Sequence, residues 1–487
     1  MRKAERELLM ENKDSNKTLI IVILAVAALC GCLITSCCAV TFFTVSMLDK
    51  NTISDIFSQH PQNLIPEESP ESEDPSAQQP AADYPSDQDL EKEAESLGLT
   101  PEELEIIQVT EKTRGIQAEE KLAPVYRTED ELREYMIEEL AEVTDEELAD
   151  ELGLYNLLGF APKDFDLRQY YVDLYTEQIA GYYDPEENAM YLITDISPYE
   201  NALTLSHEYT HYLQYNYPDF DETLNYDDDF CETNGETCLI ISSLIEGDAS
   251  LVENLVDVKD TILKDQETEP EDSEAASDIF DRSPKFFQDS LLFPYVYGFD
   301  FVTYHYLKNG FDGVNQLYTE LPQSIEQVMH PEKYMEDAPI DVTLEPFRHL
   351  ITKEFDTVRE DVMNESDIMM LLGSGYDPDW QLTERQAASG ADGWGGGSFL
   401  FARKDDKPLF FSKIVWDSAD EAAEAEKAFR MYCDKRFGQQ TADDSWTGTE
   451  DGSVYLIRQS DILYWMILPD NFESESLIDL IRNGSSL

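Results

Sequence analysis

Basic residues are scarce in this sequence of 487 residues, since 34 Lys and Arg stand against 103 Asp and Glu and give a formal net charge of −69. Such a charge argues against binding to nucleic acid and against adhesion to anionic lipid headgroups. Most of it is expected to form a solvated surface, although it would also suit basic or cationic substrates. Histidine is scarcer still, with 6 residues, so histidines at the spacing of metal ligands carry information.

Charge is missing altogether from residues 18–48, a run long enough to cross a bilayer. Lys13 and Lys17 precede this run and acidic sequence follows it. The positive-inside rule therefore predicts a single-pass protein of the cell membrane, with a cytoplasmic tail at 1–17 and an extracytoplasmic remainder. A lipoprotein signal ending at Cys37 is the alternative interpretation. The uncharged, mostly apolar residues that follow this cysteine favour an uncleaved anchor.

Apolar residues are few in 49–95, which is rich in Pro, Ser, Glu and Asp and is predicted to be a disordered linker. Beyond it, the sequence predicts an α+β protein in two parts. The first, at 96–370, is mainly helical with a small sheet. The second, at 375–487, alternates strand and helix patterns, carries no motif for chemistry and is interpreted as an accessory α+β domain.

Local signals within 96–370 predict several elements. Thr100, Thr128 and Thr144 each offer a capping hydroxyl followed by acids, the sign of a helix start. Residues 178–184 and 189–194 are typical of a β-hairpin around an Asp-Pro turn. The second strand of this hairpin is expected to be either a plain core strand or the strand with which an extended substrate pairs.

An amphipathic helix is predicted at 197–216, with Pro198 at its first position. Its apolar and aromatic residues gather on one side, and His207, Glu208 and His211 gather on the other. Two imidazoles one turn apart can reach a single zinc ion, and the glutamate between them is placed to take a proton from water.

One large class of zinc sites has its third ligand in a histidine six residues after the second, with a glycine between them. Here Tyr217 stands at the histidine position and Gln214 at the glycine position, so that arrangement is excluded. Glu246 lies further along, within a second amphipathic helical pattern and among leucine and isoleucine. A carboxylate in such surroundings is costly to bury unless it is paired or binds a metal, so Glu246 is the predicted third ligand. The alternative is that Glu246 faces water on a polar stripe with Glu253.

The stretches HEYTH and LIEGDAS together resemble the zincin metallopeptidases, specifically the gluzincin type, whose third ligand is a downstream glutamate. The resemblance implies a zincin-like catalytic domain in which His207, His211 and Glu246 hold Zn²⁺ and Glu208 is the general base. SIEQVMHPEKY also resembles a poorly characterised group of bacterial exported or membrane-anchored proteins with the same two elements. Together these similarities cover about residues 165–345.

Two further roles stay open. Several gluzincins orient a zinc-bound histidine with an Asp four residues after the ligand glutamate, where this chain has Ser250. Asp248, Ser250 and Glu253 are the candidates for that role. A metallopeptidase also needs a hydrogen-bond donor for the developing oxyanion, for which His330 and Tyr297 are tentative candidates. Each of these two is more often structural than catalytic.

The few cysteines outside the predicted anchor suggest one disulfide. Cys231 and Cys238 are close in sequence, extracytoplasmic in this topology and bracket an Asn-Gly turn signal. Cys433 would then be an odd, buried thiol. The run of Asp just before Cys231 lacks the full spacing of a calcium loop and is interpreted as a solvated loop.

The sequence thus predicts a membrane-anchored, extracytoplasmic zinc metallopeptidase that hydrolyses peptide bonds in proteins or peptides. The alternative is a non-catalytic binding module on the zincin fold, with structural zinc or none. Glu208 favours the enzyme, because a binding module has no need of a base beside the metal.

Overall fold

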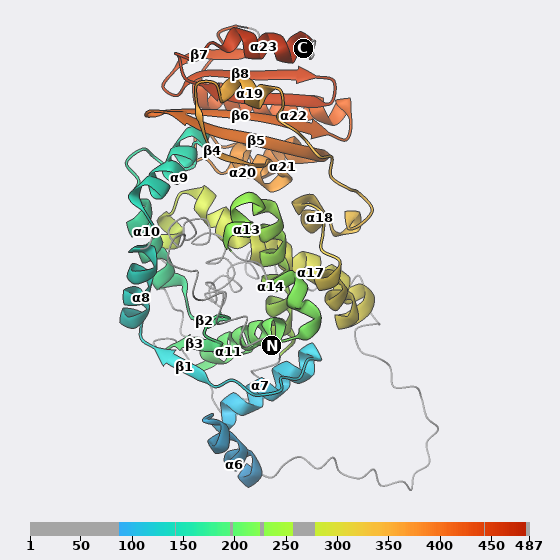
Figure 1. The fold of residues 1–487 in the computed structure, drawn as a ribbon. Helices are drawn as coiled ribbons and strands as arrows, with labels where there is room; N and C mark the ends of the chain where they lie inside the picture. The colour runs from blue at the N-terminus through green and yellow to red at the C-terminus, as the bar shows by residue number, and fades with distance from the viewer. Residues whose placement is uncertain are drawn as a thin grey trace, which may run out of the picture.

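The computed structural model describes residues 87–141, 143–194, 198–224, 228–256, 278–442 and 444–483. It confirms a mixed α+β fold, with helices around a three-stranded sheet and a separate six-stranded sheet above them (Figure 1). The predicted anchor at 18–48 lies outside the described residues. Within the ranges given above, no helix is both long and apolar enough to cross a membrane.

Five helices precede the centre of the molecule: α6 (Asp87–Leu97), α7 (Pro101–Arg114), α8 (Glu129–Ala141), α9 (Asp145–Leu158) and α10 (Leu167–Gln178). The three predicted helix starts are confirmed, because Thr100, Thr128 and Thr144 each accept a hydrogen bond from the backbone NH three residues later. Helix α6 corrects the predicted linker at its carboxyl end. Ala94 is fully buried against the core, so this part of 49–95 is folded.

The small sheet contains β1 (Pro124–Arg127), β2 (Gly181–Asp184) and β3 (Ala189–Ile193), in the order β1-β3-β2. The predicted hairpin is confirmed as the antiparallel pair of β2 and β3, while β1 runs parallel to β3. Since β3 has a partner on both sides, it is a core strand, and its interpretation as a substrate-pairing edge is wrong. The sheet packs on α11 (Pro198–Tyr215).

Two long helices, α14 (Gly235–Leu255) and α17 (Lys285–Thr319), cross beside α11. Their apolar residues join those of α7 and α11 in one hydrophobic core, called the first core below. They meet at two glycines, where a Cβ on Gly247 would lie 2.2 Å from the Gly298 carbonyl oxygen. A Cβ on Gly298 would likewise lie 2.1 Å from the carbonyl oxygen of Ser243. Only residues without a side chain allow the two backbones to approach this closely. The shorter elements here are η1 (Pro218–Phe220), α12 (Asp221–Leu224), α13 (Asp228–Thr233), α16 (Asp278–Arg282), α18 (Ile325–Met329) and η2 (Pro331–Lys333).

The C-terminal unit, 344–483, is built on an antiparallel sheet in the order β4-β5-β6-β9-β8-β7. Its strands are β4 (Asp356–Val362), β5 (Trp394–Lys404), β6 (Lys407–Trp416), β7 (Ser445–Thr449), β8 (Gly452–Gln459) and β9 (Ile462–Leu468). Helices α20 (Glu365–Gly373), α21 (Glu384–Ala391) and α22 (Ala419–Phe437) cover one face, and α19 (Phe347–Ile351) and α23 (Ser474–Asn483) cover the other. The face covered by α20, α21 and α22 forms a second hydrophobic core, and the face covered by α19 and α23 forms a third. Side chains of β5 alternate between the second and the third core, as a strand buried on both faces requires.

This unit starts earlier than the predicted boundary at 370–375. Strand β4 pairs with β5, and α20 packs against α21, so both belong to the C-terminal sheet rather than to the preceding domain. Strand β4 is a polar edge strand, whose side chains are only partly buried or exposed. Its sequence therefore lacks the alternating apolar pattern that marks the strands inside the sheet.

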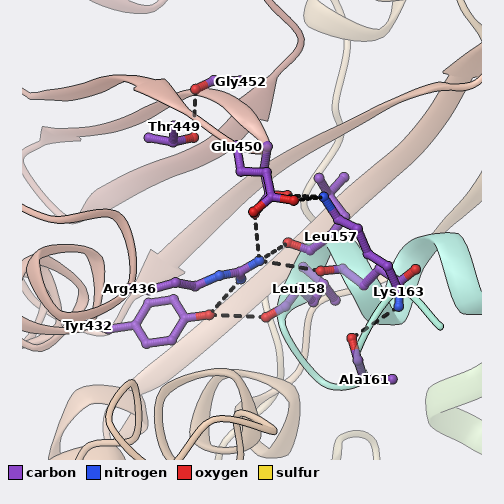
Figure 2. A network of polar contacts seen from close by, with 11 residues as sticks. Leu157, Leu158, Ala161, Lys163, Tyr432, Arg436, Thr449, Glu450 and Gly452 are labelled. Carbon is purple, nitrogen blue, oxygen red and sulfur yellow. Dashed lines mark hydrogen bonds and ion pairs between the residues drawn. The ribbon is translucent and has the colours of Figure 1, made fainter. Parts of the chain in front are cut away.

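A polar network joins the C-terminal unit to the end of α9 (Figure 2). Arg436, with a side chain only 3% exposed, donates hydrogen bonds to the carbonyls of Asn156 and Leu157. Tyr432 donates to the carbonyl of Leu158 at 3.0 Å. The last carbonyls of α9 thus find donors on α22, which satisfies groups that a helix cannot pair internally.

Candidate metal centre

Helix α11 carries the predicted motif, and both of its sides are buried. The side predicted to face the core does so, with Leu205, Tyr209 and Leu213 in the first core. The opposite side is covered by α14, so that His207 is fully buried and His211 is only 4% exposed. Glu208 lies with them, and the ligand atoms of the three residues are all within 4.8 Å of one another.

Glu246 of α14 approaches both histidines. Its Oε2 lies 3.2 Å from Nε2 of His207 and 3.6 Å from Nε2 of His211. The side chain of Glu246 is 1% exposed, and that of Glu253, seven residues further along α14, is 6% exposed. The water-facing interpretation of these two acids is therefore wrong. Glu246 is thus buried beside both histidines, and its role as the third ligand stays a prediction.

The other nitrogen of each histidine has its own partner. Nδ1 of His207 lies 3.0 Å from Oε2 of Glu253, and Nδ1 of His211 lies 2.9 Å from Oε1 of Gln214. Each partner presents an oxygen acceptor, so each Nδ1 carries the proton. Nε2 is then the atom of each ring that is left for a metal ion, and the rings are held in that orientation.

The three candidates for an orienting residue are sorted by these contacts. Glu253 contacts His207 directly. Asp248 acts one step further back, since the Gln214 amide donates to it at 3.2 Å while Arg114 forms a buried ion pair with it at 2.9 Å. The Ser250 hydroxyl has no hydrogen-bond partner among the described residues.

The roles of Arg114 and Gln214 are not part of the sequence-based prediction. Gln214 entered the prediction only as an excluded ligand, although its position three residues after His211 puts the two side chains on the same helix face. That spacing is the signal that points to Gln214. Arg114 lies 134 residues from Asp248 in the chain, and no local pattern links them.

Strong electrostatic coupling marks this centre. Burial disfavours the charge on His207, but its hydrogen bonds to Glu246 and Glu253 prevail and raise its pKa to about 10. The pKa of His211 is raised as well, since the charge of Glu246 outweighs its burial. Burial acts to raise the pKa of Glu246, yet the positive charge of His211 leads the effects that lower it. When no metal is bound, protons on the imidazoles balance the buried carboxylates, and a divalent cation suits the same donor set.

The two tentative oxyanion donors have other partners. The Tyr297 hydroxyl lies 3.7 Å from Sδ of Met369, and Nε2 of His330 lies 2.9 Å from Oε1 of Glu365. Tyr295 is the tyrosine beside the histidines, with its ring centroid 6.5 Å from that of His207. Residues two apart on a helix point to different sides, and Tyr295 shares the side of the crossing glycine three positions later.

The structure joins Cys231 and Cys238, the pair predicted from spacing and compartment, in a disulfide between α13 and α14. Cys433 is free and buried in the second core. The Asp run before Cys231 falls partly outside the described residues.

Comparison with known proteins bears on the C-terminal unit alone. Residues 352–475 match a protein family described as a domain of unknown function, DUF8575. The match begins directly after α19 and ends at the start of α23, so every residue of the metal centre lies outside it. No curated protein and no solved structure matches the chain. The metal centre is therefore interpreted from its own geometry.

Proposed function

We propose that the protein is a zinc metallopeptidase, with His207, His211 and Glu246 as the metal ligands. The observation that carries the proposal is the convergence of two imidazole Nε2 atoms on one buried carboxylate oxygen, at 3.2 and 3.6 Å. Both rings are held at Nδ1, by Glu253 and Gln214. One carboxylate and two imidazoles are a donor set typical of catalytic zinc, and the ordered Nδ1 contacts match the surroundings of such ligands.

A zinc ion held by this donor set supplies Lewis acidity, which polarises a carbonyl group and makes water more acidic. Glu208 is the general base of the proposed reaction. Its carboxylate accepts the proton of the water that attacks the peptide carbonyl and then delivers it to the leaving amine. Because Glu208 is only 2% exposed, its charge acts in surroundings that screen it weakly. Glu253 and Gln214 accept hydrogen bonds from Nδ1 of the two imidazoles, which would leave both rings turned with Nε2 towards the metal position.

The substrates are proposed to be proteins or peptides outside the cytoplasm. The net charge of −69 disfavours nucleic acid and is compatible with basic segments of a polypeptide. The uncharged run at 18–48 supports attachment to the cell membrane by one N-terminal helix, with the catalytic part on the extracytoplasmic side.

The decisive experiment replaces the base without touching a ligand. Glu208→Gln keeps the shape of the side chain but removes its ability to accept a proton. We expect the purified variant to retain zinc and thermal stability while hydrolysis of an unfolded protein substrate falls by about 10²–10⁴-fold. Glu138→Gln, an exposed glutamate of α8, is the matched control and should cleave like the wild type.

Two results would contradict the proposal in different ways. If Glu208→Gln cleaves at the wild-type rate, the glutamate is not the base. If the zinc-loaded wild type cleaves nothing across a broad peptide library, the protein is better described as a binding module on the same scaffold. A chelator control on the wild type separates zinc-dependent cleavage from contaminating proteases.

A further inference from the structure

A second cluster of ligand-type side chains lies where the C-terminal unit meets the helices around the metal centre. His330, Glu365 and Asp392 each offer one ligand atom, and these atoms are all within 4.8 Å of one another. They come from three separate segments. His330 links α18 to η2, Glu365 begins α20, and Asp392 follows the end of α21. Figure 1 shows α18 beside α20 and α21 at this junction.

Glu365 is the buried member of the cluster. Its side chain is 3% exposed, and Oε1 lies 2.9 Å from Nε2 of His330. The second oxygen, Oε2, is also buried and has no hydrogen-bond partner among the described residues. A buried carboxylate oxygen without a donor is costly, and the His330 contact at Oε1 leaves Oε2 without one.

A neighbouring cluster shows how the protein neutralises such a group with its own residues. Glu326, Asp337 and Asp417 also lie within ligand distance of one another. Lys333 reaches into that cluster, 2.6 Å from Glu326 and 3.4 Å from Asp337. In the described part of the chain, no lysine or arginine forms an ion pair with Glu365 or its exposed neighbour Asp392, although the charge of Lys333 acts on Glu365 from further away and works to lower its pKa.

We propose that His330, Glu365 and Asp392 bind a second divalent metal ion, of the zinc or manganese type. One imidazole and two carboxylates form a mixed nitrogen and oxygen donor set of the kind such ions prefer. The exposed position of Asp392 gives the ion a path from solvent, and the burial of Glu365 gives it a desolvated partner. The ion ties α18 to α20 and α21, and so fastens the C-terminal unit to a helix that packs against α14.

An ordinary ion pair between His330 and Glu365 explains only part of this geometry. It accounts for the contact at Oε1, but it leaves Oε2 without a donor and gives no reason for the approach of Asp392. The metal assignment accounts for all three side chains. It also gives His330 a role unrelated to the reaction proposed at His207 and His211.

The test is the zinc content of the full-length protein, measured by elemental analysis after equilibration with zinc and a wash with a weak chelator. We expect about two zinc ions per chain in the wild type and about one in Asp392→Asn. His207→Ala/His211→Ala should also keep about one, and the combination of all three changes should keep none. Asp379→Asn, an exposed aspartate before α21, is the matched control and should bind like the wild type.

Thermal unfolding gives an independent readout. Zinc should raise the Tm of His207→Ala/His211→Ala, because a ligand that binds only the folded state stabilises that state. This rise should vanish when Asp392→Asn is added, since the second site is then lost. Asp392 is exposed, so its substitution should leave the fold intact even if Glu365→Gln does not.

Each outcome decides between the two sites. If the wild type holds one ion that disappears with His207→Ala/His211→Ala and not with Asp392→Asn, the second site does not exist. If zinc content is the same in wild type and Asp392→Asn, the proposal is equally overturned. A single ion that is lost with Asp392→Asn instead supports the second site and counts against the first, so failure of one proposal is distinguishable from failure of the other.

Discussion

The crossing of α14 and α17 at two glycines makes a sharp prediction for Gly247→Ala. The added Cβ would lie 2.2 Å from the carbonyl oxygen of Gly298 and 2.4 Å from its carbonyl carbon. Ordinary contacts of a Cβ begin at 3.4 Å, so the two helices would have to separate by about an ångström. The opposing atoms belong to the backbone of a long helix and cannot rotate out of the way.

The expected cost follows from that geometry. Overfilling a packed interface costs about 1–3 kcal/mol, and a clash with backbone should fall at the upper end, near 3 kcal/mol. In a protein of this size such a loss lowers Tm by roughly 3–4 °C. Gly247 directly follows Glu246, so the displacement also moves a proposed ligand. Zinc affinity should therefore fall together with stability.

The same substitution at Gly153 is the matched control. Gly153 lies inside α9, and a Cβ there would meet its nearest neighbour, the Phe401 ring, at an ordinary 3.6 Å. Gly153→Ala should thus be neutral or stabilise the protein by about 0.5–1 kcal/mol, as expected for a helix interior. Thermal and urea unfolding of both variants, with zinc content measured in parallel, tests the reasoning. It would be refuted by a Gly247→Ala protein as stable as Gly153→Ala.

Two more predictions follow from buried carboxylates. Glu253→Gln removes the negative charge beside Nδ1 of His207 but keeps an acceptor, so zinc affinity should fall about 10–100-fold in chelator competition, and unchanged affinity would show that the contact is incidental. Burial raises the pKa of Glu151 to about 7, against the hydrogen bonds that Tyr155 and Tyr171 donate. The unfolded chain then loses this proton first, so the residue lowers stability as pH rises from about 4.5 to 7, by on the order of 3 kcal/mol. Urea unfolding of Glu151→Gln should show a correspondingly weaker decline than the wild type, and an identical decline would argue against the shift.

Local signals carried the correct part of the sequence-based prediction. The capping residues Thr100, Thr128 and Thr144 begin helices because a hydroxyl and an acid three residues later satisfy neighbouring backbone groups. The periodicity of α11 places His207 and His211 on one side, because four residues make slightly more than one turn. These contacts lie within a few residues, so the sequence contains them.

The errors arise where distant segments meet. The sequence does not predict strand β4, because an edge strand half-exposed to solvent has little apolar pattern. Only its pairing with β5 shows that it belongs to the C-terminal sheet. The prediction names Tyr297 rather than Tyr295, because only the crossing at Gly298 determines which side of α17 faces the histidines. The acids of α6 are typical of a linker, although Ala94 is buried in the core and Leu90 and Leu97 pack against it.

The donors that complete α9 have a consequence for how the protein is made. Asn156 and Leu157 leave the ribosome early, but the guanidinium that pairs with their carbonyls belongs to Arg436, about 280 residues later. At a synthesis rate of about 5–20 residues per second, that interval lasts roughly 15–60 seconds. During that interval the last carbonyls of α9 lack the donors that Arg436 supplies, and the six-stranded sheet of the C-terminal unit has not yet formed. A nascent chain interrupted before α22 therefore contains the complete HEYTH helix but lacks the donors that complete α9. The molecule can assemble fully only when almost the whole polypeptide has been synthesised.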